Sequence, residues 1–206
     1  MKRAIALLLL AAVAGAALAS LTRDDSPARL VRAELAGMKL AYERAYARDE
    51  VTAAGGLADR LAFLASYPRF TAPVGKARAP LVKVTVTPVE EGLDPQDRPA
   101  KLYARFLTSE TLEGPSGLVL RRFEPDSPYD SEELFLAPPD GREFFARCPK
   151  AQLGAPGEGC LSIFRTGALE VELRYPPELL DHWDALYEGA RALLARMQRL
   201  AVRPAR

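Results

Sequence analysis

The sequence predicts an α+β fold: an antiparallel sheet of about six to seven short strands, with N-terminal helices and a long C-terminal amphipathic helix packed on it. Three observations lead to this prediction. Short segments rich in aromatic and β-branched residues recur between residues 80 and 175, separated by turn residues. An apolar stripe of helical period follows Pro176-Pro177. Two further helical patterns precede residue 67.

Residues 1–19 have the features of a signal peptide. Lys2 and Arg3 form a short basic start, an apolar run follows, and Ala17-Leu18-Ala19 is a typical small-residue cleavage pattern. We therefore expect cleavage after Ala19 and a periplasmic or secreted body. The alternative is an uncleaved single-pass inner-membrane anchor, because residues 4–21 are just long enough to span a bilayer. The body is exported in both cases, since the basic residues stay inside.

Residues 20–67 are predicted to form an N-terminal helical arm. Ser26 and Pro27 suit the N-cap and first position of a helix that runs to about residue 48. Its apolar face would consist of Val31, Leu35, Met38, Tyr42 and Ala45. A shorter helix is expected over residues 57–66, ending before Pro68. The proline-rich residues 68–80 are interpreted as an extended connector to an α+β domain of residues 81–206.

Seven strands are expected in the α+β domain, at residues 80–87, 101–107, 118–123, 134–137, 143–148, 160–166 and 168–175. The last is the clearest, because its apolar residues alternate strictly with Glu170, Glu172 and Arg174. A two-residue loop at Thr166-Gly167 would join the last two strands and place Cys160 on the buried face. One face of this hairpin is thus predicted to be buried and the other exposed.

The C-terminal helix is predicted from residue spacings of four and three. Its stripe consists of Leu179, Trp183, Leu186, Ala190, Leu193, Met197 and Leu200. Pro177 suits the first turn of this helix. Packing on the sheet is favoured over a coiled coil, because the stripe covers barely three heptads and the small side chain of Ala190 would contribute little apolar contact between two helices.

The two cysteines, Cys148 and Cys160, are predicted to form a structural disulfide. An even cysteine count in an exported chain is typical of a disulfide, since the compartment is oxidising. Closing a loop of this size contributes roughly 3 kcal/mol in the chain-entropy model. Two free buried thiols are the alternative. A redox-active pair is disfavoured because the C-x-x-C spacing is absent.

Charge and composition exclude several classes of function. Without Lys2 and Arg3, 26 basic residues face 27 acidic ones, and this balance argues against nucleic acid as the partner. One histidine and two paired cysteines cannot supply a usual zinc site, and the acidic loops lack the spacing of a calcium loop. No phosphate-binding glycine loop is present either. We therefore expect no metal, no cofactor and no catalytic residue.

Aromatic residues give the one hint of a binding surface. Phe144 and Phe145 are neighbours on a strand, so their side chains must point to opposite faces. One is expected in the core, and the other needs cover from a helix or a partner. Tyr67 and Phe70, at the connector, are included in this possible binding surface.

These observations favour an exported bacterial envelope protein that acts by binding another envelope protein. Two roles fit: a periplasmic accessory module of a membrane complex, or an inhibitor or immunity-type partner of another exported protein. One alternative is a hydrolase that uses His182, the single histidine, with Ser116 or Ser162. Another is an anchored protein that self-associates through the helix of residues 26–48 and meets the membrane only through its uncleaved N-terminus.

Overall fold

The computed structural model describes residues 26–73, 75, 79–150 and 159–202. The predicted signal peptide and its cleavage site lie outside the described residues. Within the part of the chain that is described, no helix has both the length and the apolar composition needed to cross a membrane.

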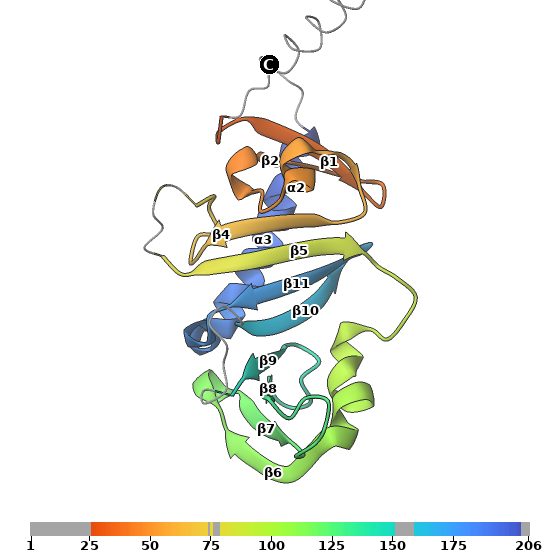
Figure 1. The fold of residues 1–206 in the computed structure, drawn as a ribbon, viewed down its shortest axis with the longest axis vertical. Helices are drawn as coiled ribbons and strands as arrows, with labels where there is room; N and C mark the ends of the chain where they lie inside the picture. The colour runs from red at the N-terminus through yellow and green to blue at the C-terminus, as the bar shows by residue number, and fades with distance from the viewer. Residues whose placement is uncertain (1–25, 74, 76–78, 151–158, 203–206) are drawn as a thin grey trace, which may run out of the picture.

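The main sheet has eight strands, all antiparallel to their neighbours, in the order β4-β5-β11-β10-β9-β8-β7-β6 (Figure 1). Its strands are β4 (Leu61–Ser66), β5 (Leu81–Pro88), β6 (Leu107–Glu113), β7 (Val119–Phe123), β8 (Glu132–Leu136), β9 (Phe145–Pro149), β10 (Cys160–Thr166) and β11 (Leu169–Tyr175). The predicted α+β fold with an antiparallel sheet is confirmed, and the predicted strand count is close to the observed one.

The N-terminal segment forms a small sheet of order β2-β1-β3 in place of the predicted first helix. Its strands are β1 (Leu30–Leu35), β2 (Met38–Glu43) and β3 (Gly56–Ala58). Ala36 and Gly37 join β1 to β2, with φ angles of 50° and 75°. Positive φ at both central residues is the geometry of a type I′ hairpin turn. The chain therefore reverses in the middle of the predicted helix, and the prediction of a helical arm over residues 20–67 is wrong.

The second predicted helix, over residues 57–66, is also wrong, because this stretch contributes β3 and the edge strand β4. Ala62 and Phe63 are neighbours and are both fully buried. A strand buried on both faces is continuously apolar and cannot be told from a buried helix by its period. The one α-helix in this region is the short α2 (Glu50–Ala54), which Asp49 caps by accepting the Thr52 N–H.

The predicted strand over residues 101–107 is helical instead. The segments η2 (Pro95–Asp97), η3 (Pro99–Tyr103) and η4 (Ala104–Phe106) follow one another, and β6 begins after them. Strand alternation would have separated Leu102 and Phe106 from Tyr103. A helical turn places all three on one side, where they form a second apolar cluster with β7, β8 and β9.

The predicted C-terminal helix is confirmed. After the six-residue 3-10 segment η6 (Pro177–His182), α3 (Trp183–Val202) runs behind β4, β5 and β11 in Figure 1. The buried members of the predicted stripe are Leu179, Leu186, Ala190, Leu193 and Met197. They share one core with residues of β1, β2, β5 and β11. The N-terminal segment is thus part of the same core as the main sheet.

The β10–β11 hairpin differs from its predicted register by two residues. Thr166 pairs with Leu169, so the loop is Gly167-Ala168, and Cys160 pairs with Tyr175. Because a shift of two preserves the side-chain alternation, every residue keeps its predicted face. Cys160 is fully buried, as predicted.

Candidate docking face

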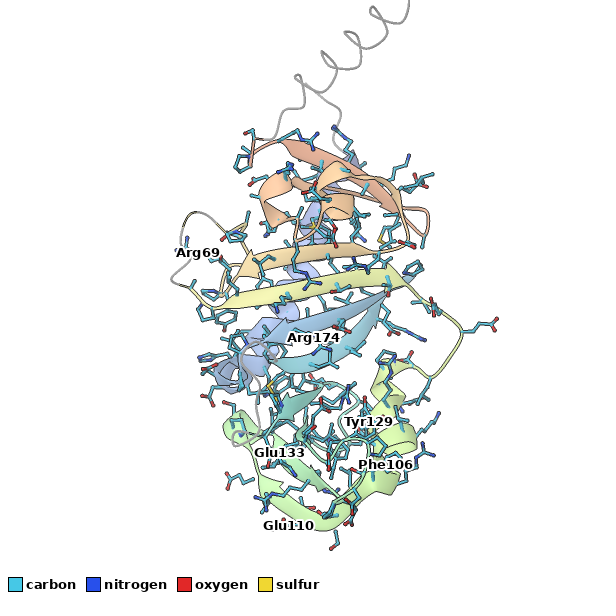
Figure 2. All side chains as sticks on the ribbon, viewed as in Figure 1. Arg69, Phe106, Glu110, Tyr129, Glu133 and Arg174 are labelled. Carbon is cyan, nitrogen blue, oxygen red and sulfur yellow. A yellow bond between two sulfur atoms is a disulfide. The ribbon has the colours of Figure 1, made fainter. Side chains whose placement is uncertain are left out.

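The half-sheet of β4, β5, β11 and β10 packs on α3 with one face, and no described helix crosses the centre of its other face (Figure 1). We call this second face the open face. The side chains that point to this side include Ala62 and Leu64 on β4, Lys83, Thr85 and Thr87 on β5, Glu170, Glu172 and Arg174 on β11, and Leu161, Ile163 and Arg165 on β10. Ala62 and Leu161 are buried, and the charged residues and threonines make up most of the rest. Figure 2 shows Arg174 in front of the strands, on the side away from α3. This face was predicted from the alternation in β11.

Strand pairing aligns the side chains of the open face in rows. At the end near the β10–β11 loop, Glu170 lies opposite Arg165, which is a favourable pairing of opposite charges. At the other end, Arg174 lies opposite Lys83, which pairs like charges. The two ends of the open face therefore differ in their electrostatics.

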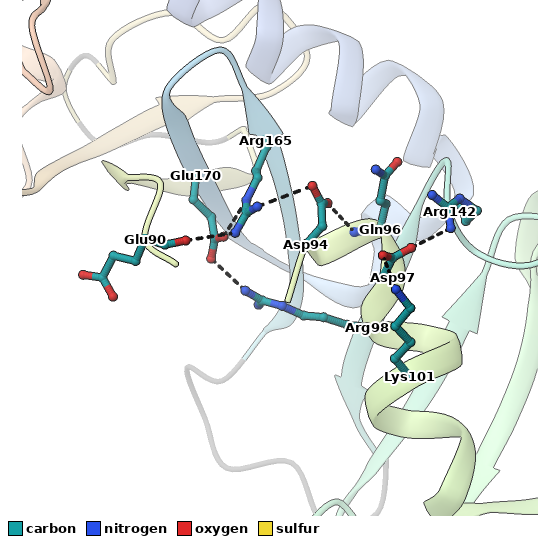
Figure 3. Close-up of polar contacts among 9 residues, drawn as sticks. All are labelled: Glu90, Asp94, Gln96, Asp97, Arg98, Lys101, Arg142, Arg165 and Glu170. Atoms are coloured by element: carbon teal, nitrogen blue, oxygen red, sulfur yellow. Dashed lines mark hydrogen bonds and ion pairs between the residues drawn. The ribbon is translucent and has the colours of Figure 1, made fainter. Parts of the chain in front are cut away.

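The first end is closed by ion pairs that join the β10–β11 hairpin to the segments η2 and η3 (Figure 3). Glu170 accepts from Arg98 Nη2 at 2.9 Å and from Arg165 Nε at 3.3 Å. Arg165 Nη1 also lies 3.4 Å from Asp94 Oδ2. About a fifth to a third of each side chain is exposed, so these pairs are less screened than surface pairs. We interpret this network as the attachment of the 95–106 segment to the sheet.

The network continues outward through Asp97, which binds Lys101 and Arg142. The hydrogen bond from Lys101, with a further contribution from Arg142, holds the pKa of the Asp97 carboxyl below its usual value. Glu90 contributes its carbonyl oxygen to Arg165, while its carboxylate points away in Figure 3. No described residue forms an ion pair with the carboxylate of Glu90 or of Glu91. This end of the open face thus has an acidic rim.

The second end carries a cavity of about 320 Å³. Its lining residues are Leu81, Lys83, Gly159, Arg174, Tyr175, Pro176, Pro177 and Glu178. Arg174 Nε donates to Glu172 Oε1 at 2.9 Å, and both side chains are more than a third exposed. Lys83 is exposed and has no hydrogen bond or ion pair with any described residue. The basic end therefore has a lysine without an ion-pair partner among the described residues, next to a cavity with mainly apolar walls.

A disulfide between Cys148 and Cys160 holds β9 against β10 beside this cavity, with the two Cα atoms 4.1 Å apart. The predicted pairing of the cysteines is thus present, although residues 151–158 of the enclosed loop lie outside the described residues. Gly159 approaches β11 so closely that an added Cβ would lie 2.2 Å from the Tyr175 carbonyl oxygen. The cavity wall is therefore fixed by a covalent bond and a close backbone contact.

The aromatic binding surface predicted from the sequence is not formed, because its main members are buried. Phe144 is 2% exposed and packs on Trp183, with ring centroids 5.0 Å apart. Phe145 is 3% exposed and packs on the opposite side against Tyr103. Phe70 is also buried, and Tyr67 is half-buried against the core. The adjacent phenylalanines do point to opposite faces, and helical segments cover both.

The residues of the hydrolase alternative are not assembled into a catalytic pair. His182 stacks on Tyr67, with ring centroids 6.2 Å apart. The Ser116 hydroxyl donates to the Asp181 carbonyl at 2.8 Å, while Ser162 is buried and bonded to the Tyr175 hydroxyl. Among the described residues, no hydrogen bond joins His182 to either serine. No group of three or more His, Cys, Asp or Glu side chains in the described ranges could hold a metal ion.

Sequence reasoning placed Arg174 on the polar face of its strand but did not identify the basic end as a site. The polar face of β11 was visible in the alternation of residues 170–174. Lys83 carried no signal of its own, because its position opposite Arg174 depends on the pairing of β5 with β11 across 91 residues. Local patterns do not specify such a pairing.

No family model matches this chain, and no curated protein matches its sequence. Among solved structures, the chain is similar to an immunity protein of the Stenotrophomonas maltophilia type IV secretion system. The TM-score is 0.59 at 14% sequence identity, and the match covers 82% of this chain and 93% of that one. At this level of identity, the likeness shows that the two proteins share a fold.

Proposed function

We propose that this chain is an immunity-type binding protein of the bacterial cell envelope. It is exported to the periplasm, binds another exported protein through the open face, and inhibits that protein by contact. The proposal replaces the aromatic surface considered from the sequence with a polar sheet face, since that is what the strands expose.

The observation that carries the proposal is the open face itself. The four strands β4, β5, β11 and β10 pack on α3, and strand pairing holds the charged side chains of their other face in rows. The Cys148–Cys160 disulfide links β10 to β9 next to this face. A stable complex buries a total of about 1,200–2,000 Å², or roughly half of that on each partner. Four strands at about 4.8 Å spacing and about seven residues in length span roughly 440 Å² in projection, so the open face would form the central part of such an interface. A rigid platform loses little conformational entropy on binding.

The shared fold supports the same role. The neighbour of known structure is an immunity protein of a type IV secretion system, and the likeness extends over 93% of its chain. Binding to another protein is the function that this comparison suggests for the present chain. The predicted signal peptide and the disulfide agree with a site of action outside the cytoplasm.

The test is a crosslinked pull-down of the full chain, tagged at its C-terminus, from its native envelope, followed by mass spectrometry. We expect one stoichiometric exported protein, whose activity falls when the purified chain is added in equal amount. Intact mass should show loss of residues 1–19. Recovery of a multi-subunit membrane complex would favour the accessory role instead, and a preparation without a partner would overturn the proposal.

A further inference from the structure

The basic end of the open face contains two cations in a cross-strand pair. Lys83 on β5 lies directly opposite Arg174 on β11. Side chains opposite one another on antiparallel strands have Cβ atoms about 4.5–5.5 Å apart, and like charges at this position are destabilising. Glu172, two residues along β11, neutralises Arg174 but forms no ion pair with Lys83. The folded chain therefore keeps two like charges at an unfavourable cross-strand position.

The cavity beside this pair is shaped to take a side chain from outside. It measures about 320 Å³, and Leu81, Pro176 and Pro177 provide apolar walls. Glu178 is the one carboxylate that lines it, and this side chain is exposed and unpaired among the described residues. Lys83 thus has a cavity beside it, and its ammonium group has no ion-pair partner among the described residues.

We propose that this corner binds an aspartate or glutamate side chain of the partner protein, with the partner's carboxylate lying between Lys83 and Arg174. The inference rests on the proposed function and specifies the chemistry of the partner. One carboxylate relieves the repulsion of both cations at once, and Arg and Lys donors to a carboxylate form charge-assisted hydrogen bonds. Glu90 and Glu91 at the other end of the face repel a second acidic group, so the bound segment has a fixed direction.

A polyanion such as nucleic acid does not fit this corner. Glu172 and Glu178 flank the two cations, and the mature chain is close to neutral. Nucleic acid binding draws on an extended basic surface. A single carboxylate on a protein surface matches a site with one unpaired cation.

The test combines site-specific crosslinking with charge reversal in the full chain. A photo-reactive residue at Thr85, in the centre of the open face, should crosslink the partner in the native envelope. The same residue at Glu110, on the distant edge strand β6, should not. The crosslinked partner peptide is then sequenced, and its nearest Asp or Glu is changed to Lys.

Lys83→Glu should weaken binding of the purified partner about tenfold or more. The partner's Asp or Glu to Lys change should restore binding to Lys83→Glu but not to the wild type. Lys39→Glu is the control for binding, because Lys39 is also an exposed strand lysine without an ion pair. Its Tm should not rise, since Lys39 lies opposite Glu34 and the variant places two carboxylates opposite each other. Without the partner, Lys83→Glu should raise Tm by roughly 1–3 °C, because it removes the like-charge contact. A variant that is more stable yet binds less well cannot be explained by misfolding.

The outcomes separate the two proposals. If no protein crosslinks at Thr85 and none is pulled down, the proposed function is wrong, and this inference is wrong with it. If a partner crosslinks at Thr85 but binds Lys83→Glu as tightly as the wild type, the function stands and the carboxylate site is wrong. A crosslink to a second copy of this chain would also overturn the inference.

Discussion

The ring of Phe70 lies directly on Gly189 of α3. A Cβ built on this glycine would be 2.3 Å from Cε2 of the ring. The ring cannot withdraw easily, because the Phe70 carbonyl accepts hydrogen bonds from Arg196 at 2.7 Å and from Tyr46 at 3.1 Å. The residues that follow β4 are thus joined to the C-terminal helix by a contact that requires glycine in the helix.

Gly189→Ala should therefore destabilise the chain, although alanine is the better helix former by about 1 kcal/mol. We expect a net loss of about 1–3 kcal/mol, the usual cost of overpacking a core. Thermal unfolding of the purified chain measures it, at roughly 2–4 °C of Tm per kcal/mol.

The matched control for Gly189→Ala is the double variant with Phe70→Leu. Leucine removes the ring atoms that meet the new methyl group, so the two substitutions together should cost less than the sum of their separate effects. An increase in Tm for Gly189→Ala alone would show that the ring moves aside without cost.

The elements that could be predicted from the sequence are those whose residue spacing matches the face that they bury. The alternation in residues 169–175 and the stripe of residues 179–197 each have one buried face, so the period identified both element and orientation. The cysteine pairing was predictable because the chain has no other cysteines. The open face followed from the first of these patterns.

The N-terminal strands were mispredicted because two periods fit the same residues. Val31, Leu35, Met38 and Tyr42 have helical spacing, yet Val31, Ala33 and Leu35 also alternate as a strand does. The signal that decides between them is Ala36-Gly37, the hairpin turn. The basic end of the candidate site could not be predicted, because it joins strands that are distant in sequence.

The disulfide should contribute roughly 3 kcal/mol to the free energy of unfolding, because it closes a loop and so lowers the conformational entropy of the unfolded chain. Replacing both Cys148 and Cys160 by serine avoids a leftover free thiol and should lower Tm by roughly 6–12 °C. Reductant should bring the wild type to the Tm of this variant and leave the variant unchanged. Alkylation of both cysteines in the unreduced, native chain would contradict the bond itself.

Acid should weaken the attachment of α2 through Asp49. Burial raises the pKa of this carboxyl, but the hydrogen bonds from Thr52 and the charge of Arg60 outweigh it and hold the pKa below its usual value. A lowered folded-state pKa contributes stability above the unfolded value of about 4, and this contribution is lost as the pH falls through the folded pKa. The free energy of unfolding at pH 3 should therefore be lower than at pH 7 by part of the amount that Asp49 contributes.

Asp49→Asn separates charge from capping, because asparagine still accepts the Thr52 N–H but cannot pair with Arg60. The wild type should exceed Asp49→Asn by about 0.5–1 kcal/mol at pH 7, and the difference should shrink towards pH 3. Asp59→Asn is the control, since Asp59 is exposed and has no ion pair with a described residue. A pH-independent difference between wild type and Asp49→Asn would refute the assignment.

The hydroxyls of Ser162 and Tyr175 form an isolated polar pair in the core, 2.7 Å apart. Both side chains are at most 2% exposed, and burial raises the pKa of Tyr175, which keeps its hydroxyl neutral. Removing one hydroxyl leaves the other buried without a partner, so Ser162→Ala and Tyr175→Phe should each cost about 1–3 kcal/mol. The double variant leaves no unpaired group.

The double variant should therefore be more stable than the sum of the single effects predicts, by about 1 kcal/mol or more in a double-mutant cycle. Urea unfolding of all four proteins measures the cycle, and an unchanged m-value shows that the unfolded state is comparable. Ser131→Ala, at an exposed serine, is the control and should stay within about 0.5 kcal/mol of the wild type. Strict additivity would mean that the hydroxyls do not depend on each other.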